Sequence, residues 1–360
     1  MMIKPPRSSA RYMMPSRIDL YTADGWLNVP AVRSYMLEHH LPMLFCVGGR
    51  ATGKTYGALQ DARARALTGP KFAYMRRTQT QADLVRKDEL SPFKRIDLDN
   101  NYYTRVAVIT KQVSGFYDGD EGPLLGYCLA LSTMSNTRGM DFSDVTDLIY
   151  DEFIPEAHER PITGEADALL NCYETINRNR ELQGRPPLLM CCYANANNLA
   201  NPIFAGLGLV DIARKASTQG REVWEIPERG ILLLFLDNSP ISKAKAGTAL
   251  YRMTAGTGFS QMSLGNQFKD ANDNTLGSAP LRELSPIVAV GDICIYRHKG
   301  NRQWYVNKHI SGAPKTFDSG EVELQRFRAS HIWLWRAYLN RKVLFDSYST
   351  ELLFRQYFGA

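Results

Sequence analysis

The sequence predicts an α/β fold in which a parallel sheet is flanked by helices, and two observations carry that prediction. A short apolar run, Met43 to Val47, is followed by a glycine-rich loop and then by a helix-forming stretch that ends at Thr68-Gly69-Pro70. A second apolar run begins at Val145 and ends in Asp151 and Glu152. Continuous apolar runs of this length are typical of strands that are buried on both faces, as in parallel sheets.

The loop after the first strand predicts a nucleotide site. Its residues fit the phosphate-loop (Walker A) pattern G-x-x-x-x-G-K-[ST] at every fixed position. Glycines let the backbone coil around a phosphate, and the following helix adds its positive dipole end. Lys54 is expected to reach the β- and γ-phosphates of ATP, and Thr55 to offer its hydroxyl to Mg²⁺. The predicted nucleotide-binding residues are Gly48, Gly49, Arg50, Ala51, Thr52, Gly53, Lys54 and Thr55.

The second strand supplies the other half of the predicted site (Walker B), because Asp151 follows Lys54 by 97 residues. At the C-terminal end of a parallel strand, Asp151 can hold Mg²⁺ together with Thr55 and water. Glu152 is placed to orient and deprotonate the water that attacks the γ-phosphate. An adjacent Asp-Glu pair is typical of the additional-strand P-loop NTPases, a class that includes translocases and helicases. The sequence therefore predicts a P-loop ATPase with a catalytic glutamate.

Two further strands are expected to end at the same rim of the sheet. The apolar run from Leu188 ends in Asn195. In motor ATPases such a strand lies between the two Walker strands and its last polar residue senses the γ-phosphate, although Asn195 can also be read as the start of an asparagine-rich turn. Arg76 and Arg77 come at the end of another strand, at the same rim. Two interpretations stay open for them: contact with phosphates or with DNA, and exposure to solvent.

Hydrolysis also needs positive charge on the transition state beyond that of Lys54. Arg178 and Arg180 follow a helix that is expected to begin near Glu165, on an exposed edge suited to an arginine finger from a neighbouring subunit. Arg138, upstream of the Asp-Glu strand, is a second candidate. The alternative for each of these residues is an ordinary solvated arginine.

Composition indicates a globular protein with two domains, or one large domain with an appendage. The chain has 360 residues, 44% hydrophobic and 22% charged. No run approaches the roughly 18 apolar residues of a membrane span, and the basic arm at residues 1–17 lacks the apolar core of a secretory signal. The six cysteines and six histidines show no metal-ligand spacing. We therefore expect reduced thiols in the cytoplasm, with neither zinc nor disulfides.

The C-terminal third is expected to hold strands and helices with a basic surface. Residues 290–345 contain ten Lys and Arg against four Asp and Glu, which equals the net charge of +6 of the whole chain. Gly300-Asn301 predicts a hairpin turn. Cations and the rings of Tyr296, Trp304 and Tyr305 alternate around it, as suits nucleic-acid contact, and the alternative is a solvated hairpin with core aromatics. The cations are Arg297, Lys299, Arg302 and Lys308.

These motifs together resemble the phage terminase-type packaging ATPases, and most of all the DNA-encapsidation ATPases of small tailed phages with protein-primed genomes. The resemblance covers most of the chain from Leu44 to Phe268, in order, and the final ninety residues match only loosely. Besides the phosphate loop it rests on four segments: Tyr150 to Ile154, Arg178 to Glu181, Asn201 to Phe204, and Gln261 to Phe268.

The resemblance implies a role for each matching residue. Lys54 and Thr55 take the positions of the phosphate-loop Lys and its hydroxyl neighbour, and Asp151 and Glu152 those of the magnesium aspartate and catalytic glutamate. Arg178 falls on the finger that crosses the subunit interface, with Arg138 at a second cationic position acting across it and Asn195 on the sensor strand. The cofactors implied are ATP and Mg²⁺.

The resemblance also implies partners and a place of action. Members of the family form a ring of five subunits at the portal, or connector, of an empty prohead, and push double-stranded DNA inward. A packaging RNA is a further partner, and the C-terminal domain could meet that RNA, the portal or the DNA. The chain is thus expected in the host cytoplasm and transiently at the portal vertex, with no membrane contact.

We expect three regions. Residues 1–235 form the ATPase domain with its basic arm, 236–275 a small linker or lid subdomain, and 276–360 a C-terminal α+β domain. Full terminases carry a ribonuclease-H-like nuclease in the third place, but residues 286–315 hold only one acidic residue, Asp292. A nuclease-like domain without its catalytic residues is therefore expected. The alternatives are a full terminase with an active nuclease and a nucleotide-binding scaffold without motor activity.

Overall fold

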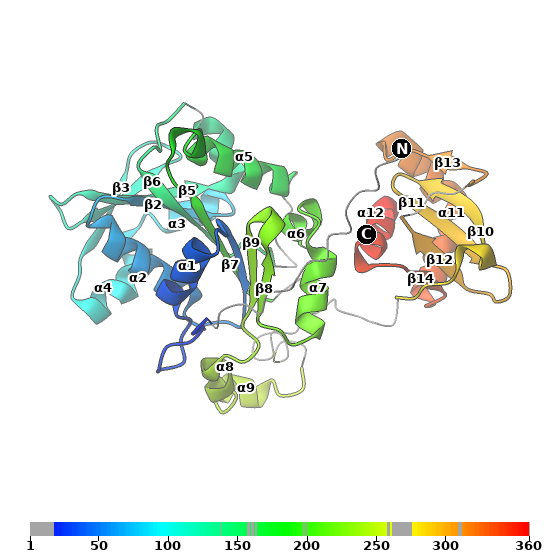
Figure 1. Cartoon of the computed structure of the whole chain (residues 1–360), viewed down its shortest axis with the longest axis horizontal. Helices are drawn as coiled ribbons and strands as arrows, with labels where there is room; N and C mark the ends of the chain where they lie inside the picture. The colour runs from blue at the N-terminus through cyan, green and yellow to red at the C-terminus, as the bar shows by residue number, and fades with distance from the viewer. Residues whose placement is uncertain are drawn as a thin grey trace, which may run out of the picture.

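The structure is a computed structural model that describes residues 18–359 except 138, 157–158, 160–161, 163, 197–198, 200, 258–259, 261–275 and 309–311. Arg138 and the segment Gln261 to Phe268 therefore lie outside the described residues. The described chain forms a large N-terminal lobe and a smaller C-terminal one (Figure 1). No helix of the described residues is both long enough and apolar enough to cross a membrane.

A nine-stranded sheet forms the centre of the N-terminal lobe. Its six middle strands, from β5 to β9 in space, are all parallel, as the sequence predicts. The remaining strands, β3 and β4 at one side of the sheet and β8 at the other, pair antiparallel with their neighbours and were not expected from the sequence. The spatial order is β3 (Thr104–Val108), β4 (Ser114–Asp118), β5 (Leu124–Ala130), β2 (Lys71–Arg76), β6 (Val145–Asp151), β7 (Leu189–Ala194), β1 (Met43–Val47), β9 (Ile231–Phe235) and β8 (Val223–Ile226).

Helices cover both faces of this sheet, which explains why its central strands are apolar throughout. Along β1, Leu44 and Cys46 contribute to one core while Phe45 and Val47 contribute to the other. The first face packs against α1 (Val29–Glu38), α2 (Lys54–Ala66), α3 (Gln79–Leu84) and α4 (Lys94–Asn100). The second face packs against α5 (Glu165–Asn177), α6 (Pro202–Gly206) and α7 (Val210–Thr218).

The strand order brings the predicted site residues to one rim. β7 lies between β1 and β6 and pairs with both in parallel, so the ends of these three strands meet. This confirms that the strand ending before Asn195 lies between the two Walker strands. Asp151 pairs with Tyr193, and Val47 pairs with Ala194.

Two short helices follow the last parallel strand, where the sequence predicts a small subdomain. They are α8 (Pro240–Lys245) and α9 (Ala249–Met253), and they form a small projection below the sheet in Figure 1. Ser239 caps α8, and its hydroxyl accepts a hydrogen bond from the Ser242 amide at 3.4 Å. The sequence predicts helical structure around 243–253, and the structure divides it into two helices at Gly247.

The C-terminal lobe is an α+β domain with its own five-stranded sheet and core. The predicted hairpin at Gly300-Asn301 joins β11 to β12, and their antiparallel pairing confirms it. Ser349 of the last helix donates a hydrogen bond to Asp211 of α7 at 2.8 Å, which ties this lobe to the first. The elements are β10 (Leu284–Val290), β11 (Ile293–His298), β12 (Trp304–Asn307), β13 (Thr316–Phe317), α11 (Glu321–Leu339), β14 (Val343–Phe345) and α12 (Tyr348–Phe358).

The prediction that aromatic rings of the C-terminal hairpin stack on nucleic acid is wrong. Tyr296 and Tyr305 are opposite each other in the β11–β12 pair and are 1% and 8% exposed, so they are core residues and not stacking platforms. The Trp304 ring is half-buried and packs against Trp333 with 4.6 Å between ring centroids. The alternation of cations and aromatic rings suggested one exposed face. It could not reveal that both faces of this hairpin contribute to buried cores.

Candidate nucleotide-binding and catalytic site

The phosphate loop joins β1 to α2, and its backbone takes conformations that only some residues tolerate. Gly53 caps α2 in the left-handed region, with φ of 88°, and a Cβ atom there would lie 3.3 Å from that of Trp26. Gly48 packs so closely that a Cβ atom would lie 2.8 Å from the Leu236 side chain. Both glycines of the motif are therefore required by the loop's shape.

Lys54 is buried within this loop. Its ammonium group donates hydrogen bonds to the carbonyl oxygens of Gly48 at 3.0 Å and Gly49 at 2.7 Å. It also approaches the Asn195 amide oxygen at 3.4 Å. Burial lowers the pKa of Lys54, against the opposing charges of Cys46, Glu152 and Asp151. The side chain thus places a desolvated cation at the centre of the loop, where a phosphate would be attracted strongly.

The side chains of Thr55 and Asp151 meet across the rim of the sheet. The Thr55 hydroxyl donates a hydrogen bond of 2.8 Å to Asp151 Oδ1. A hydroxyl and a carboxylate are hard oxygen ligands, which Mg²⁺ prefers, and a nucleotide-bound Mg²⁺ needs only a few ligands from the protein. The two residues therefore fit a magnesium site, as the sequence predicts.

The other oxygen of Asp151 is bound by two residues of β2. Tyr74 donates a hydrogen bond to Asp151 Oδ2 at 2.9 Å, and Arg76 forms an ion pair with the same oxygen at 2.9 Å. Burial, followed by the charge of Asp151, raises the pKa of Tyr74 well above its ordinary value, so the phenol stays neutral and donates. The sequence alone did not decide whether Arg76 contacts phosphates, contacts DNA or lies in solvent. In the structure it pairs with the carboxylate of Asp151.

Glu152 and Asn195 face each other at the same rim. The Asn195 amide nitrogen lies 3.2 Å from each carboxylate oxygen of Glu152. Burial, and then the charge of Asp151, raises the pKa of Glu152 above its ordinary value of 4.5. Since Asn195 also approaches Lys54 with its amide oxygen, it links the candidate base to the loop cation. Asn195 therefore does more than begin a turn.

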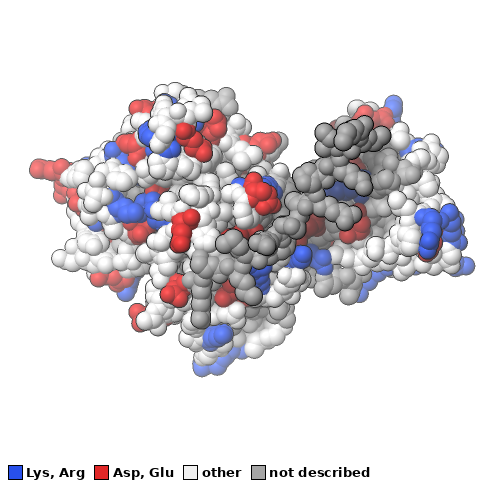
Figure 2. Space-filling model, in the orientation of Figure 1, with Lys and Arg blue, Asp and Glu red and all other residues white. Residues whose placement is uncertain are grey.

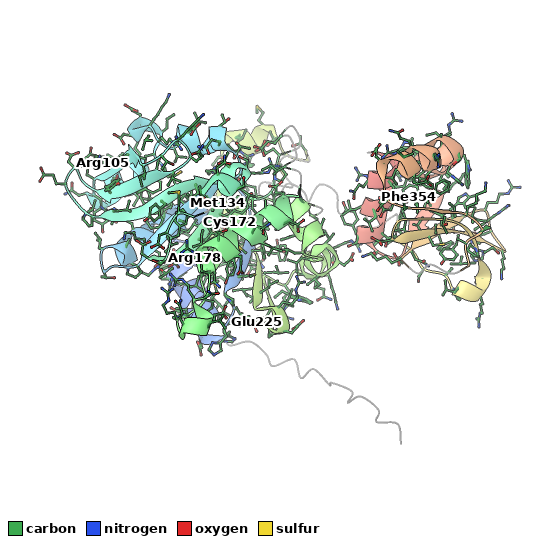
Figure 3. All side chains as sticks on the ribbon, turned by 90° about the horizontal axis from the view of Figure 1, so that it is seen from above. Arg105, Met134, Cys172, Arg178, Glu225 and Phe354 are labelled. Atoms are coloured by element: carbon green, nitrogen blue, oxygen red, sulfur yellow. The ribbon has the colours of Figure 1, made fainter. Side chains whose placement is uncertain are left out.

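The candidate fingers lie elsewhere. Arg178 follows α5, which runs from the rim of the site to the opposite ends of the strands, where β6 begins. Figure 3 labels Cys172 within this helix and Arg178 at its end. The Arg178 guanidinium is about half exposed and donates to the Met140 carbonyl at 2.6 Å. Arg180 is only 4% exposed and binds the carbonyls of Ser143 and Val145, so it serves structure and is not a finger.

The four cations predicted near the C-terminal hairpin do not share one environment. Arg297 is exposed and its guanidinium lies 5.9 Å from the centre of the Trp304 ring. Lys299 donates to the Arg282 carbonyl at 2.7 Å, whereas Arg302 and Lys308 are exposed. Figure 2 shows Lys and Arg side chains at the outer edge of this lobe, so a basic surface is present there. Its role in nucleic-acid binding stays a prediction.

Sequence reasoning missed two contributors to the site. Tyr74 gave no signal, because its contact with Asp151 depends on β2 lying next to β6, and strand order is not written in local sequence. Lys245 of α8 donates a hydrogen bond to the carbonyl of Arg50 in the phosphate loop at 2.6 Å. Nothing in the alanine- and lysine-rich segment around Lys245 distinguishes it from a solvated lysine.

Comparison with known proteins finds relatives among the DNA packaging proteins of Bacillus phages. The "DNA packaging protein" of Bacillus phage B103 is 31% identical to this chain over 245 residues, which are 66% of this chain and 68% of that protein. The protein of the same description from Bacillus phage phi29 is 28% identical over 243 residues, covering 65% of this chain and 64% of that protein. The chain thus spans about two thirds of the length of these relatives.

Two solved structures share the fold over nearly the whole chain. A chain of the bacteriophage Phi-29 viral genome packaging motor assembly superposes with a TM-score of 0.63 at 20% identity, over 90% of this chain and 97% of that one. The Phi-28 gp11 DNA packaging motor gives a TM-score of 0.59 at 20% identity, over 90% and 96%. The sequence profile of the podovirus DNA encapsidation proteins (Gp16) matches residues 32–278. This chain therefore belongs to the podovirus DNA encapsidation protein family.

Proposed function

We propose that this protein is an ATP-hydrolysing motor subunit that moves double-stranded DNA into a preformed capsid. The observation that carries the ATPase part is the convergence of Lys54, Thr55, Asp151, Glu152 and Asn195 at one rim of the sheet. The DNA-packaging part is supported by family membership and by the descriptions of the relatives.

Each residue of this rim has a part in the proposed hydrolysis. Lys54 would exchange its contacts with loop carbonyls for the β- and γ-phosphates, and the loop amides would bind the remaining phosphate oxygens. Thr55 and Asp151 would hold Mg²⁺, which draws charge from the phosphate oxygens when it is bound. Tyr74 and Arg76 hold the Asp151 carboxylate in place through its second oxygen.

Glu152 is the proposed general base. A carboxylate with a raised pKa accepts a proton from water more readily than an ordinary one, and Asn195 holds it in position. Because Asn195 also contacts Lys54, movement of that lysine onto the phosphates would remove one partner of Asn195. Asn195 would in this way register the presence of a triphosphate.

Arg178 is proposed to act on a neighbouring subunit. The helix α5 has 13 residues and therefore spans about 20 Å, from Glu165 near the rim to the opposite ends of the strands, where β6 begins. The Arg178 side chain, at this end of the helix, is too far from the phosphate loop of its own subunit to reach it. The position suits a finger in a ring, as does the second proposed cation, Arg138, and the portal and DNA would lie on the axis of that ring.

A nuclease is the second candidate activity, and no observation favours it. Within the parts of the chain that the structure describes, no three His, Cys, Asp or Glu side chains gather in a possible metal site. The loss of nuclease chemistry from the C-terminal domain remains our prediction.

The proposed base is tested by the isosteric change Glu152→Gln. We expect the rate of ATP hydrolysis to fall by about 10²–10⁴-fold, since the amide cannot accept a proton. ATP affinity should stay within a few fold, because Glu152 contacts Asn195 and no part of the phosphate loop. Lys54→Ala is the control that loses binding itself. Hydrolysis by Glu152→Gln at the wild-type rate would remove Glu152 from the mechanism.

A further inference from the structure

The helix α8 is seated beside the phosphate loop. Its first residue, Pro240, packs on Gly25 so closely that a Cβ atom on that glycine would lie 2.8 Å from it. The neighbouring Trp26 ring packs on Gly53 of the loop. The side chains of Ser239 and Ser242, which cap and begin the helix, are buried. These contacts fix the start of α8 on the same surface as the loop.

Lys245 ends this helix with its side chain turned onto the loop. Its ammonium group donates a hydrogen bond of 2.6 Å to the Arg50 carbonyl. The ammonium group of Lys54 donates one of 2.7 Å to the carbonyl of Gly49, the preceding residue. Two cations are thus bound to consecutive carbonyl groups of one loop.

Both ammonium groups have carbonyl oxygens of the phosphate loop as hydrogen-bond partners, and the carboxylates of Glu152 and Asp151 offset part of the charge of Lys54. Like charges in a partly desolvated site repel each other, and carbonyl dipoles offset that repulsion only in part. A group with several negative oxygens, bound between the two ammonium groups, would remove the repulsion and satisfy both. The phosphate chain of a nucleoside triphosphate has that charge and that number of acceptors.

We propose that Lys245 is a second phosphate-contacting ammonium group of the nucleotide site, supplied by α8 of the same subunit. The inference rests on the proposed function, because it takes the phosphate loop to bind a nucleoside triphosphate. It adds that Lys245 contacts the terminal phosphate, so that α8 holds a triphosphate more tightly than a diphosphate. The loss of that phosphate after hydrolysis would then free the lysine, and with it the helix.

The competing explanation is that Lys245 only supports the loop through the Arg50 carbonyl. A purely structural lysine would affect ATP and ADP binding equally, and its removal would lower the melting temperature. A phosphate-contacting lysine affects the triphosphate selectively. Lys243 is the matched control, since it carries the same charge on the same helix and is exposed.

The test is equilibrium binding of a non-hydrolysable ATP analogue and of ADP, each with Mg²⁺, to the full-length chain. We expect Lys245→Ala to lower the affinity for the analogue by about 10–100-fold, as is typical of the loss of one charged hydrogen bond. The affinity for ADP should fall by less than about threefold. Lys245→Arg should recover most of the lost affinity, and Lys243→Ala should match the wild type. Thermal melting without nucleotide should be alike in all of these proteins.

Two results would overturn the inference. If Lys245→Ala binds both nucleotides as the wild type does, Lys245 makes no phosphate contact. If it loses affinity for both equally and melts at a lower temperature, its role is structural, and the proposed ATPase function stands in either case. A wild-type chain that binds neither nucleotide would overturn the proposed function and this inference with it.

Discussion

Several residues of this molecule adopt backbone conformations that side chains disfavour. Glu152 has φ of 57° and Arg178 has φ of 47°, and a positive φ of this kind costs a non-glycine residue on the order of 1–3 kcal/mol. Ala51, within the phosphate loop, has φ of 54°. Such conformations persist where neighbouring contacts hold them, and they gather at functional sites. For Glu152 the holding contact is Asn195, and for Arg178 it is the Met140 carbonyl.

A carboxyl group at the end of β9 gives the fold a pH dependence. Burial, and then the charge of Glu222, raises the pKa of Asp237 from 3.8 to about 7. Between these two values the unfolded chain ionises while the folded chain keeps its proton. The free energy of unfolding should therefore fall as pH rises from about 4 to about 7 through this group.

The substitution Asp237→Asn removes this pH-dependent contribution to the free energy of unfolding. We expect the variant to gain stability over the wild type at pH 8, with a smaller gain at pH 5, as measured by urea unfolding at both pH values. Asp24→Asn, at an exposed position before α1, should give no such difference. An Asp237→Asn effect that is the same at both pH values would contradict the raised pKa.

At the scale of elements, α5 connects the proposed nucleotide site, at its first residue, to the proposed arginine finger, which follows its last residue. Its first residue, Glu165, is fully buried and accepts two hydrogen bonds from Arg77, at 2.6 and 2.9 Å. Arg77 directly follows Arg76, which holds Asp151. Because breaking a buried pair leaves an uncompensated charge, this anchor fixes α5 relative to the Walker B strand, and Arg178 follows at its other end.

A finger at the end of α5 predicts complementation between inactive subunits. Arg178→Ala and Lys54→Ala should each abolish most ATP hydrolysis alone, and mixing them should restore part of it. Recovery follows because one kind of interface pairs an intact phosphate loop with an intact finger. Arg185→Ala, which removes a nearby exposed arginine, should keep full activity. Absence of recovery at every mixing ratio would count against a finger acting between subunits.

The elements also show what the sequence could and could not predict. The strands β1, β6 and β7 and the helices α2 and α5 were predictable, because buried parallel strands and helix ends leave strong local patterns. The strands β3, β4 and β8 were not, since strands of four or five residues without a continuous apolar run leave only a weak local pattern. The pairing of Arg76 with Asp151 and of Lys245 with the phosphate loop depends on which elements lie together in space.

At the scale of the whole molecule, the proposed ATP site and the basic surface belong to different lobes. Lys and Arg side chains line the outer edge of the C-terminal lobe in Figure 2, and residues 290–345 carry a balance of +6 from ten basic and four acidic residues. The Ser349–Asp211 hydrogen bond joins this lobe to α7, which packs on the nine-stranded sheet. The proposed motor would need such a connection between the lobe that hydrolyses ATP and the lobe that meets a polyanion or the portal.

The measurement that tests this account most directly is the steady-state rate of ATP hydrolysis with and without long double-stranded DNA. The account predicts strong stimulation by DNA in the wild-type chain, and no hydrolysis by Glu152→Gln under either condition. The stimulation should weaken steeply as salt rises, because contacts with phosphates dominate such binding. A rate that DNA does not change, or one that Glu152→Gln retains, would contradict the proposal that this protein is a DNA-translocating ATPase.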